Sequence, residues 1–227
     1  MTDARTTLTA AGRHLSALGL SPGTSGNISL RTPDGILVTP TGGSLAALET
    51  DRLSLLDGDG RVRTGPPPTK EVPLHRAVHA HIADAAAVVH LHSTYAVALA
   101  CTEPDDPADT LLPFTPYTVM RLGRVPLLPY APPGTLELAD GVRQLAMDTA
   151  AFLLAQHGPV TIGRDLDEAV SRAIELEEAC RLQLVLLPAP VVRALTPAQR
   201  ADLAAQTRHI APAVAQRGAD ATTEDRA

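Results

Sequence analysis

Apolar residues recur at steps of three and four near the start of the chain and then switch to a strand-like period. The first pattern predicts an amphipathic helix over residues 5–19, with Leu8 and Leu18 on its apolar face. Two short apolar segments then flank a Pro-Asp-Gly turn and predict a hairpin over residues 27–38. A second strand–turn–strand unit is expected over residues 52–65.

Strands and helices alternate along the rest of the chain. The segment from Ala85 to His92 predicts a buried strand, and a strand, a break and a second strand are expected over residues 150–163. Thr69 is the expected N-cap of a helix that tolerates Pro73 only in its first turn, and Asp165 is the expected cap of a long helix. Helices are expected over residues 70–82, 93–101, 136–147, 165–187 and 197–215, and a short strand is expected within residues 125–130.

Hairpins outnumber strand–helix–strand units in this pattern, which indicates an α/β domain whose sheet is mainly antiparallel. Residues 102–135 are rich in proline and are otherwise expected to form loops. Neither an internal repeat nor a long linker divides the chain. We therefore expect one folded domain over residues 1–190, followed by a C-terminal helix and a flexible tail over residues 191–227.

Composition narrows the class of protein further. The 227 residues carry a formal charge of −6 with a pI near 5.7, which argues against binding to a nucleic acid backbone. Apolar runs are too short to span a membrane, and the N-terminus lacks the apolar core of a signal peptide. Two widely spaced cysteines fit a reducing cytoplasm. Lys70 is the single lysine of the sequence, so a basic surface patch is excluded.

His90 and His92 end the buried strand one residue apart. Residues i and i+2 of a strand point to the same face, so both imidazoles can reach one metal ion. The alternative is one buried, neutral histidine and one solvated histidine. His157 also follows an apolar strand, and strand ends of one sheet lie close together in space. Three imidazoles with an open position suit a catalytic zinc, and imidazole also suits iron, cobalt or nickel.

Glu71 lies in the first turn of the helix that follows Thr69. An acidic residue there can simply complement the helix dipole. It can also act as a base beside an anion held by the helix N-terminus, Thr69 and Lys70. His75 lies one turn further and is in a position to support Glu71, whereas His79 and His81 are expected to be solvated.

Two glycine-containing stretches, residues 24–29 and 39–44, lie at strand edges beside small hydroxyl and amide residues. They could offer backbone N–H groups together with Ser25, Asn27 and Thr41 to an anion, or be ordinary turns. Neither stretch fits the P-loop pattern.

Taken together and in order, these stretches resemble the class II aldolase/adducin family over about residues 8–187. The likeness is closest to the family's 3-oxo-tetronate 4-phosphate decarboxylase branch, which shares "AVVHLHST" and a "FTPY…VM.LG.VPL.PY" segment. Typical aldolases have Ser-Ser-Glu where this chain has Thr69-Lys70-Glu71, and their C-terminal tyrosine has no counterpart after Tyr130. The matching pieces are Gly26-Asn27-Ile28-Ser29, Thr39-Pro40-Thr41-Gly42, Pro68-Thr69-Lys70-Glu71 with His75, Val88-Val89-His90-Leu91-His92 and Gln156-His157-Gly158.

The resemblance implies αβα layers around a mainly antiparallel sheet and a C4 homotetramer with active sites between subunits. It implies one Zn²⁺, or another divalent transition metal, per subunit, and Glu71 as the acid/base. Tyr117 matches a tyrosine that in related aldolases reaches in from a neighbouring subunit as a proton donor. By motif position the metal ligands would be His90, His92 and His157, and the phosphate end of the substrate would be held by Asn27, Thr41, Gly42, Thr69 and Lys70.

The implied reaction is decarboxylation of a 3-oxo-tetronate 4-phosphate to dihydroxyacetone phosphate and CO2 in sugar-acid catabolism. The metal would polarise the C3 carbonyl, and Glu71 or Tyr117 would protonate C2. A class II aldolase or epimerase of the fuculose-phosphate or ribulose-phosphate type is the alternative enzyme. A scaffold protein like adducin is the alternative outside enzymes, although such a chain would be expected to lose its ligands.

Overall fold

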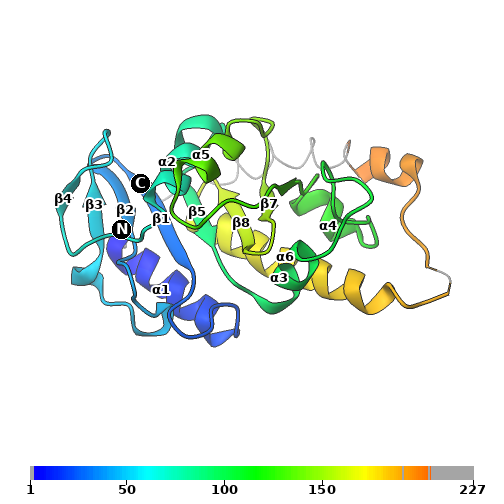
Figure 1. Ribbon diagram of the computed structural model, residues 1–227, viewed down its shortest axis with the longest axis horizontal. Coiled ribbons are helices and arrows are strands. Elements are labelled where there is room, and N and C mark those ends of the chain that lie inside the picture. The colour runs from blue at the N-terminus through cyan, green and yellow to red at the C-terminus, as the bar shows by residue number, and fades with distance from the viewer. Residues whose placement is uncertain (1–2, 191, 204, 206–227) are drawn as a thin grey trace, which may run out of the picture.

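An eight-stranded sheet forms the centre of the protein, which is a computed structural model that describes residues 3–190, 192–203 and 205 (Figure 1). The strand order is β4-β3-β2-β1-β5-β8-β7-β6, and each neighbouring pair is antiparallel except β6 with β7. The strands are β1 (Asn27–Thr32), β2 (Gly35–Val38), β3 (Ser54–Leu56), β4 (Val62–Thr64), β5 (Ala87–His90), β6 (Leu127–Leu128), β7 (Ala151–Leu154) and β8 (Gly158–Gly163).

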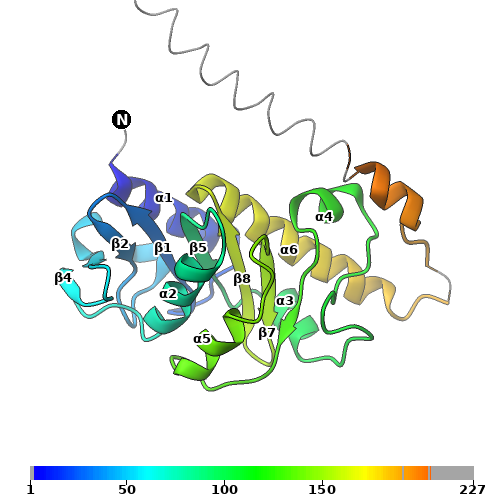
Figure 2. The same ribbon diagram turned by 90° about the horizontal axis from the view of Figure 1, so that it is seen from above.

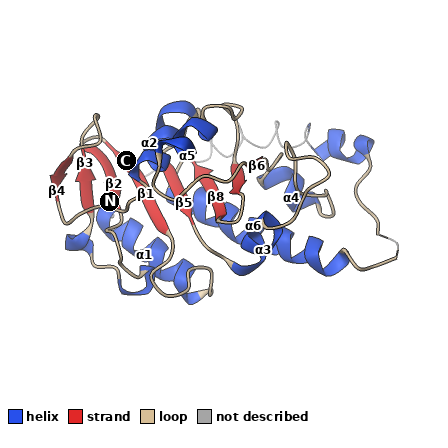
Figure 3. Ribbon diagram, viewed as in Figure 1, coloured by secondary structure: helices blue, strands red, loops and turns tan. Residues whose placement is uncertain are grey.

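Helices cover both faces of this sheet, as Figures 2 and 3 show. Helices α2 and α5 pack on one face, and α1, α3 and α6 pack on the other. The helices are α1 (Ala4–Ala17), α2 (Val72–His81), α3 (Thr94–Ala100), α4 (Pro116–Arg121), α5 (Leu136–Val142) and α6 (Leu166–Leu186), with short 3-10 turns at Leu45–Ala47 and Thr50–Arg52.

Alternate residues of the central strands supply the two cores. Val88 of β5 and Phe152 of β7 pack under α2 and α5, whereas the neighbouring Val89 and Leu153 pack against the opposite helices. This period of two is the reason that β5 and β7 are apolar at every position up to His90 and Leu154. The expected αβα layers and mainly antiparallel sheet are therefore confirmed.

Three local predictions are wrong. Helix α2 begins at Val72 with Glu71 at its N-cap, two residues later than expected, although the Thr69 hydroxyl accepts a hydrogen bond from Glu71 N at 3.3 Å. Leu18 is 48% exposed because α1 ends at Ala17. Helix α4 lies within the expected loop region and begins at a capping Thr-Pro pair, a signal that the sequence analysis missed.

The capping prediction for the long helix is confirmed, since the Asp165 side chain accepts a hydrogen bond from Glu168 N. The predicted C-terminal helix begins as expected, with residues 197–203 helical, and its remainder lies outside the described residues. The division of the chain at residue 190 stays a prediction. No helix in the described ranges has both the length and the apolar character needed to cross a membrane.

Candidate metal centre

Three histidines converge where β5 ends beside the β7–β8 turn. Strand β5 pairs with β8 so that His90 lies opposite Val160, which brings the turn residue His157 beside it. His92 follows two residues after His90, just before α3. The Nε2 atom of His90 lies 3.1 Å from Nε2 of His92 and 3.2 Å from Nε2 of His157. The sequence prediction that these three side chains meet is borne out by this geometry.

The spacing of the three Nε2 atoms fits a tetrahedral metal ion. Four ligands at 2.0–2.1 Å from zinc are separated from one another by roughly 3.3–3.4 Å. All three ligand atoms lie within 4.8 Å of one another, and the three rings meet edge to face with centroids 4.7–5.0 Å apart. The donor set of three imidazoles leaves a fourth position for substrate, as in catalytic zinc sites.

His90 is held in the tautomer that can bind a metal ion through Nε2. Nδ1 of His90 lies 2.9 Å from the carbonyl oxygen of Pro159, an acceptor only, so Nδ1 carries the hydrogen and Nε2 offers its lone pair. Burial lowers the pKa of His90 to about 4, and burial also lowers the pKa of His92 and His157. All three are therefore neutral ligands at pH 7.

Glu71 lies against the same cluster from the N-cap of α2. Its Oε2 lies 3.2 Å from Nε2 of His90, and its Oε1 lies 3.4 Å from Nε2 of His157. Burial raises the pKa of Glu71, but the facing imidazoles and a 2.7 Å hydrogen bond from Asn27 Nδ2 together hold the pKa below its ordinary value. Glu71 Oε1 is buried without a hydrogen-bond partner among the described residues, which suits an oxygen that faces a cation.

Two glycines permit the close approach of these segments. A Cβ atom on Gly158 would lie 2.3 Å from the carbonyl oxygen of Leu91, the residue between the two strand-end histidines. Gly26 has φ of +81°, and its Cβ would meet the His90 carbonyl oxygen at 3.1 Å. Both positions lie beside metal-ligand candidates, so a side chain at either would displace an imidazole.

Glu177 of α6 holds the turn that carries His92, and the sequence analysis missed it. Its carboxylate accepts hydrogen bonds from Ser93 Oγ at 2.7 Å, Tyr95 N at 2.9 Å and Ala96 N at 2.8 Å. These donors include backbone groups of the first turn of α3, which have no partner within the helix. Glu177 is only 7% exposed, so this charged side chain lies on the buried face of α6.

Four of the five residues expected at the phosphate end occupy two adjacent segments, and the fifth, Asn27, lies on β1 against Glu71. Pro40 pairs with Pro68 in an isolated bridge, and Thr69 N donates to the Thr39 carbonyl at 3.0 Å. Thr41 is therefore next to the segment that leads into Glu71. Gly42 has φ of +68° with open space around its α-carbon, and Lys70 is exposed.

Three further residues discussed in the sequence analysis lie away from the cluster. Tyr117 is 60% exposed on α4, beside Arg121, and Figures 1 and 2 both place α4 away from α2. The chain therefore does not bring Tyr117 to its own cluster. His79 is 5% exposed, so its predicted solvation is wrong: it faces β1 beneath α2. His81 is half-buried and hydrogen bonds with the Leu145 carbonyl.

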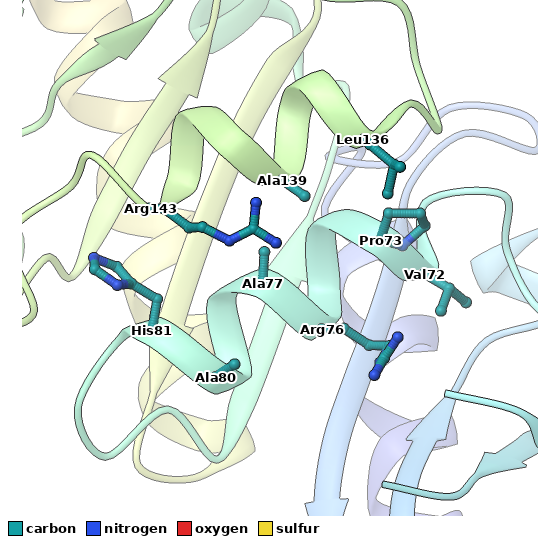
Figure 4. A pocket seen from close by; sticks show the side chains of 9 residues that line it. All are labelled: Val72, Pro73, Arg76, Ala77, Ala80, His81, Leu136, Ala139 and Arg143. Atoms are coloured by element: carbon teal, nitrogen blue, oxygen red, sulfur yellow. The ribbon is translucent and has the colours of Figure 1, made fainter. Parts of the chain in front are cut away.

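A groove of about 380 Å³ between α2 and α5 is distinct from this cluster (Figure 4). Arg143 points from α5 into the space between the two helices, and small residues such as Ala77 form its floor; Arg76 also lines the groove but extends away from α5, where it donates to the Gly58 carbonyl. None of the sequence-predicted site residues lines the groove. The candidate site is therefore on the sheet side of α2 and the groove is on its outer side.

An αβα domain with three histidines at the edge of a mainly antiparallel sheet is the arrangement to be compared with known families. Residues 6–184 match the model of the Class II Aldolase and Adducin N-terminal domain, so the chain belongs to this family.

Individual members of this family that resemble the chain include a decarboxylase and an aldolase. The chain is 46% identical over 186 residues to the 3-oxo-tetronate 4-phosphate decarboxylase of Escherichia coli K12, covering 82% of this chain and 87% of the relative. It is 35% identical to the L-fuculose phosphate aldolase of Haemophilus influenzae, covering 76% and 78%. The crystal structure of YgbL from Klebsiella pneumoniae superimposes with a TM-score of 0.84 at 44% identity, covering 88% and 96%.

Proposed function

We propose that this protein is a metal-dependent decarboxylase that converts a 3-oxo-tetronate 4-phosphate to dihydroxyacetone phosphate and CO2. The observation that carries the proposal is the convergence of His90, His92 and His157 on one point beside the carboxylate of Glu71. The 46% identity to a relative named for this reaction supports the choice of substrate. A role in sugar-acid catabolism in the cytoplasm follows from the same proposal, and the free thiols of Cys101 and Cys180 fit a reducing compartment.

His90, His92 and His157 would hold one zinc or other divalent transition ion per subunit. When bound, such an ion supplies a Lewis acid that polarises the C3 carbonyl of the substrate. Glu71 lies within 3.2–3.4 Å of two ligand atoms. Its carboxylate would take up from solvent the one proton that each decarboxylation consumes and would pass it to C2 after the substrate carboxylate leaves as CO2.

The phosphate and carboxylate of the substrate would be held at the entrance to α2. Thr41, Gly42 and Thr69 come from two paired segments; the two threonines would offer their hydroxyl groups, and Gly42 would offer its backbone N–H group. The exposed ammonium of Lys70 lies next in sequence to Glu71 and suits a substrate with a carboxylate in addition to its phosphate. Asn27 uses one amide hydrogen on Glu71 and keeps a second one for substrate.

Tyr117 would complete the site of a neighbouring subunit in a homotetramer. Its 60% exposure on α4 and its distance from its own chain's cluster support this placement. Within that arrangement its phenol would be a second proton donor near C2.

Release of CO2 is the measurement that tests the function. Zinc-loaded protein given 3-oxo-tetronate 4-phosphate should release CO2 and dihydroxyacetone phosphate in equal amounts, and His92→Ala should lose both activity and stoichiometric zinc. Glu71→Gln should keep zinc and lose most of the rate. Zinc-loaded wild type that produces no CO2 from either stereoisomer would show that the substrate assignment is wrong.

The second candidate is a sugar-phosphate aldolase or epimerase, supported by the 35% identity to a fuculose phosphate aldolase. Retro-aldol cleavage also yields dihydroxyacetone phosphate but no CO2, so the same assay with L-fuculose 1-phosphate separates the two. We favour the decarboxylase because Lys70 replaces the small serine that typical aldolases have before the glutamate.

A further inference from the structure

A buried polar ladder runs from Glu71 along the interface between α2 and β1. Glu71, His75 and His79 recur at every fourth position of α2 and form one stripe, while Asn27 and Ser29 occupy alternate positions of β1. All five side chains are at most 7% exposed. Helix–sheet interfaces are normally apolar, so a continuous polar stripe here calls for a functional explanation.

Five hydrogen-bond contacts connect the ladder from end to end. Asn27 Nδ2 contacts Glu71 Oε2 at 2.7 Å, and Asn27 Oδ1 contacts His75 Nε2 at 2.5 Å. Ser29 Oγ contacts His75 Nδ1 at 2.7 Å and His79 Nε2 at 2.8 Å. His79 Nδ1 contacts the carbonyl oxygen of Ala85 at 2.9 Å. Both ends of the ladder, the carboxylate and the carbonyl, are acceptors.

The number of available hydrogens is smaller than the number of contacts. Burial is the main cause that lowers the pKa of His75 to about 3 and of His79 to about 4, with Arg31 opposing protonation of His79 and Glu71 favouring that of His75. Each imidazole therefore carries one hydrogen at pH 7. With Glu71 ionised, Asn27 donates one hydrogen to it, and His75, Ser29 and His79 supply three more. Five contacts then share four hydrogens, and one contact of His79 has none.

The opposite direction satisfies every contact. If His79 donates from Nδ1 to Ala85, Ser29 donates to His79 and His75 donates from Nδ1 to Ser29. His75 Nε2 then accepts from the NH2 end of Asn27, whose carbonyl end faces residue 71. This setting requires a hydrogen-bond donor at residue 71 and makes one buried hydrogen bond more than the setting with ionised Glu71.

We propose that His75, Ser29 and His79 are positioning residues that set which end of the Asn27 amide faces residue 71, so that the direction of hydrogen bonding along the ladder follows the side chain at that position. In the wild type the ladder holds an amide hydrogen of Asn27 on the carboxylate of Glu71. The effect on turnover rests on the proposed function, in which Glu71 is the acid/base.

The tautomer of His75 tests the proposal without any activity measurement. Nitrogen-15 NMR of histidine-labelled, zinc-loaded protein distinguishes Nδ1–H from Nε2–H, with His75→Gln identifying the signal. Wild type at pH 7.5 should show His75 as Nε2–H, the tautomer that is required when Asn27 Nδ2 donates to Glu71 and Asn27 Oδ1 faces His75. Glu71→Gln offers a donor at residue 71, so His75 should change to Nδ1–H. The same tautomer in both proteins would overturn the proposal.

Ser29→Ala cuts the ladder at its middle, and Thr110→Val is the matched control. Thr110 also loses one buried hydroxyl bond, to the Val125 carbonyl, but is not part of the ladder. Ser29→Ala should keep zinc and KM within twofold while kcat falls about tenfold, and His75 should stay Nε2–H when Glu71→Gln is added. Thr110→Val should match wild type in both kcat and KM. An unchanged kcat in Ser29→Ala would refute the positioning role, whereas wild type that releases no CO2 would refute the proposed function and leave the NMR comparison decisive for the ladder.

Discussion

The role of Glu177 can be tested specifically, because this one side chain of α6 holds the segment that contains His92, the proposed metal ligand. Oε2 accepts two hydrogen bonds, from Ser93 Oγ and Ala96 N, and Oε1 accepts one from Tyr95 N. Glu177→Gln keeps the size of the side chain. Its amide oxygen can replace Oε2, but its NH2 group must then face the Tyr95 N–H, donor against donor.

The cost of this change follows from that geometry. One hydrogen bond to a charged acceptor is lost and a buried donor is left without a partner, which is worth about 1–3 kcal/mol. Loosening of the turn before α3 also frees His92, one residue before Ser93, so zinc affinity should fall by about tenfold or more. Urea denaturation of the metal-free protein measures the first effect, and competition with a zinc indicator measures the second.

The same helix offers a matched control for Glu177→Gln. Gln183 is also 7% exposed and bonds to another loop, accepting from Leu112 N at 2.7 Å and donating to the Thr110 carbonyl at 2.9 Å. Gln183→Ala should lower the free energy of unfolding by a similar amount and leave zinc affinity unchanged. Equal loss of zinc affinity in both variants would show that Glu177 acts only through global stability, and the reasoning would be refuted.

Three further predictions concern the same centre. Gly158→Ala should lower the free energy of unfolding in urea by about 1–3 kcal/mol and weaken zinc binding, because the added Cβ would lie 2.3 Å from the Leu91 carbonyl oxygen. Gly58→Ala, where the added Cβ meets open space, is the control. Equal stability of the two variants would contradict the packing argument. In the unfolded chain His75 and His79 become protonated below about pH 6.5, whereas in the folded protein burial lowers their pKa to about 3 and about 4. The free energy of unfolding is therefore highest above pH 6.5 and falls on acidification, by up to about 1.4 kcal/mol per pH unit for each histidine. His79→Gln should make this slope shallower in metal-free protein, and an identical slope would exclude His79 as a contributor. Removal of zinc with a chelator should lower the Tm, by the equivalent of about 2.7 kcal/mol when free zinc had been 100 times its Kd; His92→Ala should show no such shift, and an equal shift in that variant would place the zinc elsewhere.

The sequence predicted those features that depend on local periodicity. The apolar runs before His90 and His157 define β5 and β7. The two histidines meet as the strand period predicts, but the predicted strand is too long: β5 ends at His90, and His92 lies in the segment before α3. Glu177 could not be found in this way, because its three donors lie about 80 residues away and meet it only after α3 packs on α6. His79 was assigned to solvent because its partner Ser29 lies 50 residues away on another element.

Glu177 and His79 share a physical property that explains where they lie and why the sequence alone did not reveal their roles. Each is a polar side chain inside an apolar interface, where burial without a partner would cost several kcal/mol, so its partner must be supplied by another element. Glu177 receives the unpaired N–H groups of α3, and His79 receives the hydroxyl of Ser29. The contacts of Glu177 end at Ser93, one residue from His92 of the histidine cluster, and those of His79 lead through Ser29, His75 and Asn27 to Glu71. The polar groups buried on either face of the sheet therefore constrain the two halves of the candidate site separately, the proposed ligand His92 through α6 and the proposed acid/base Glu71 through α2.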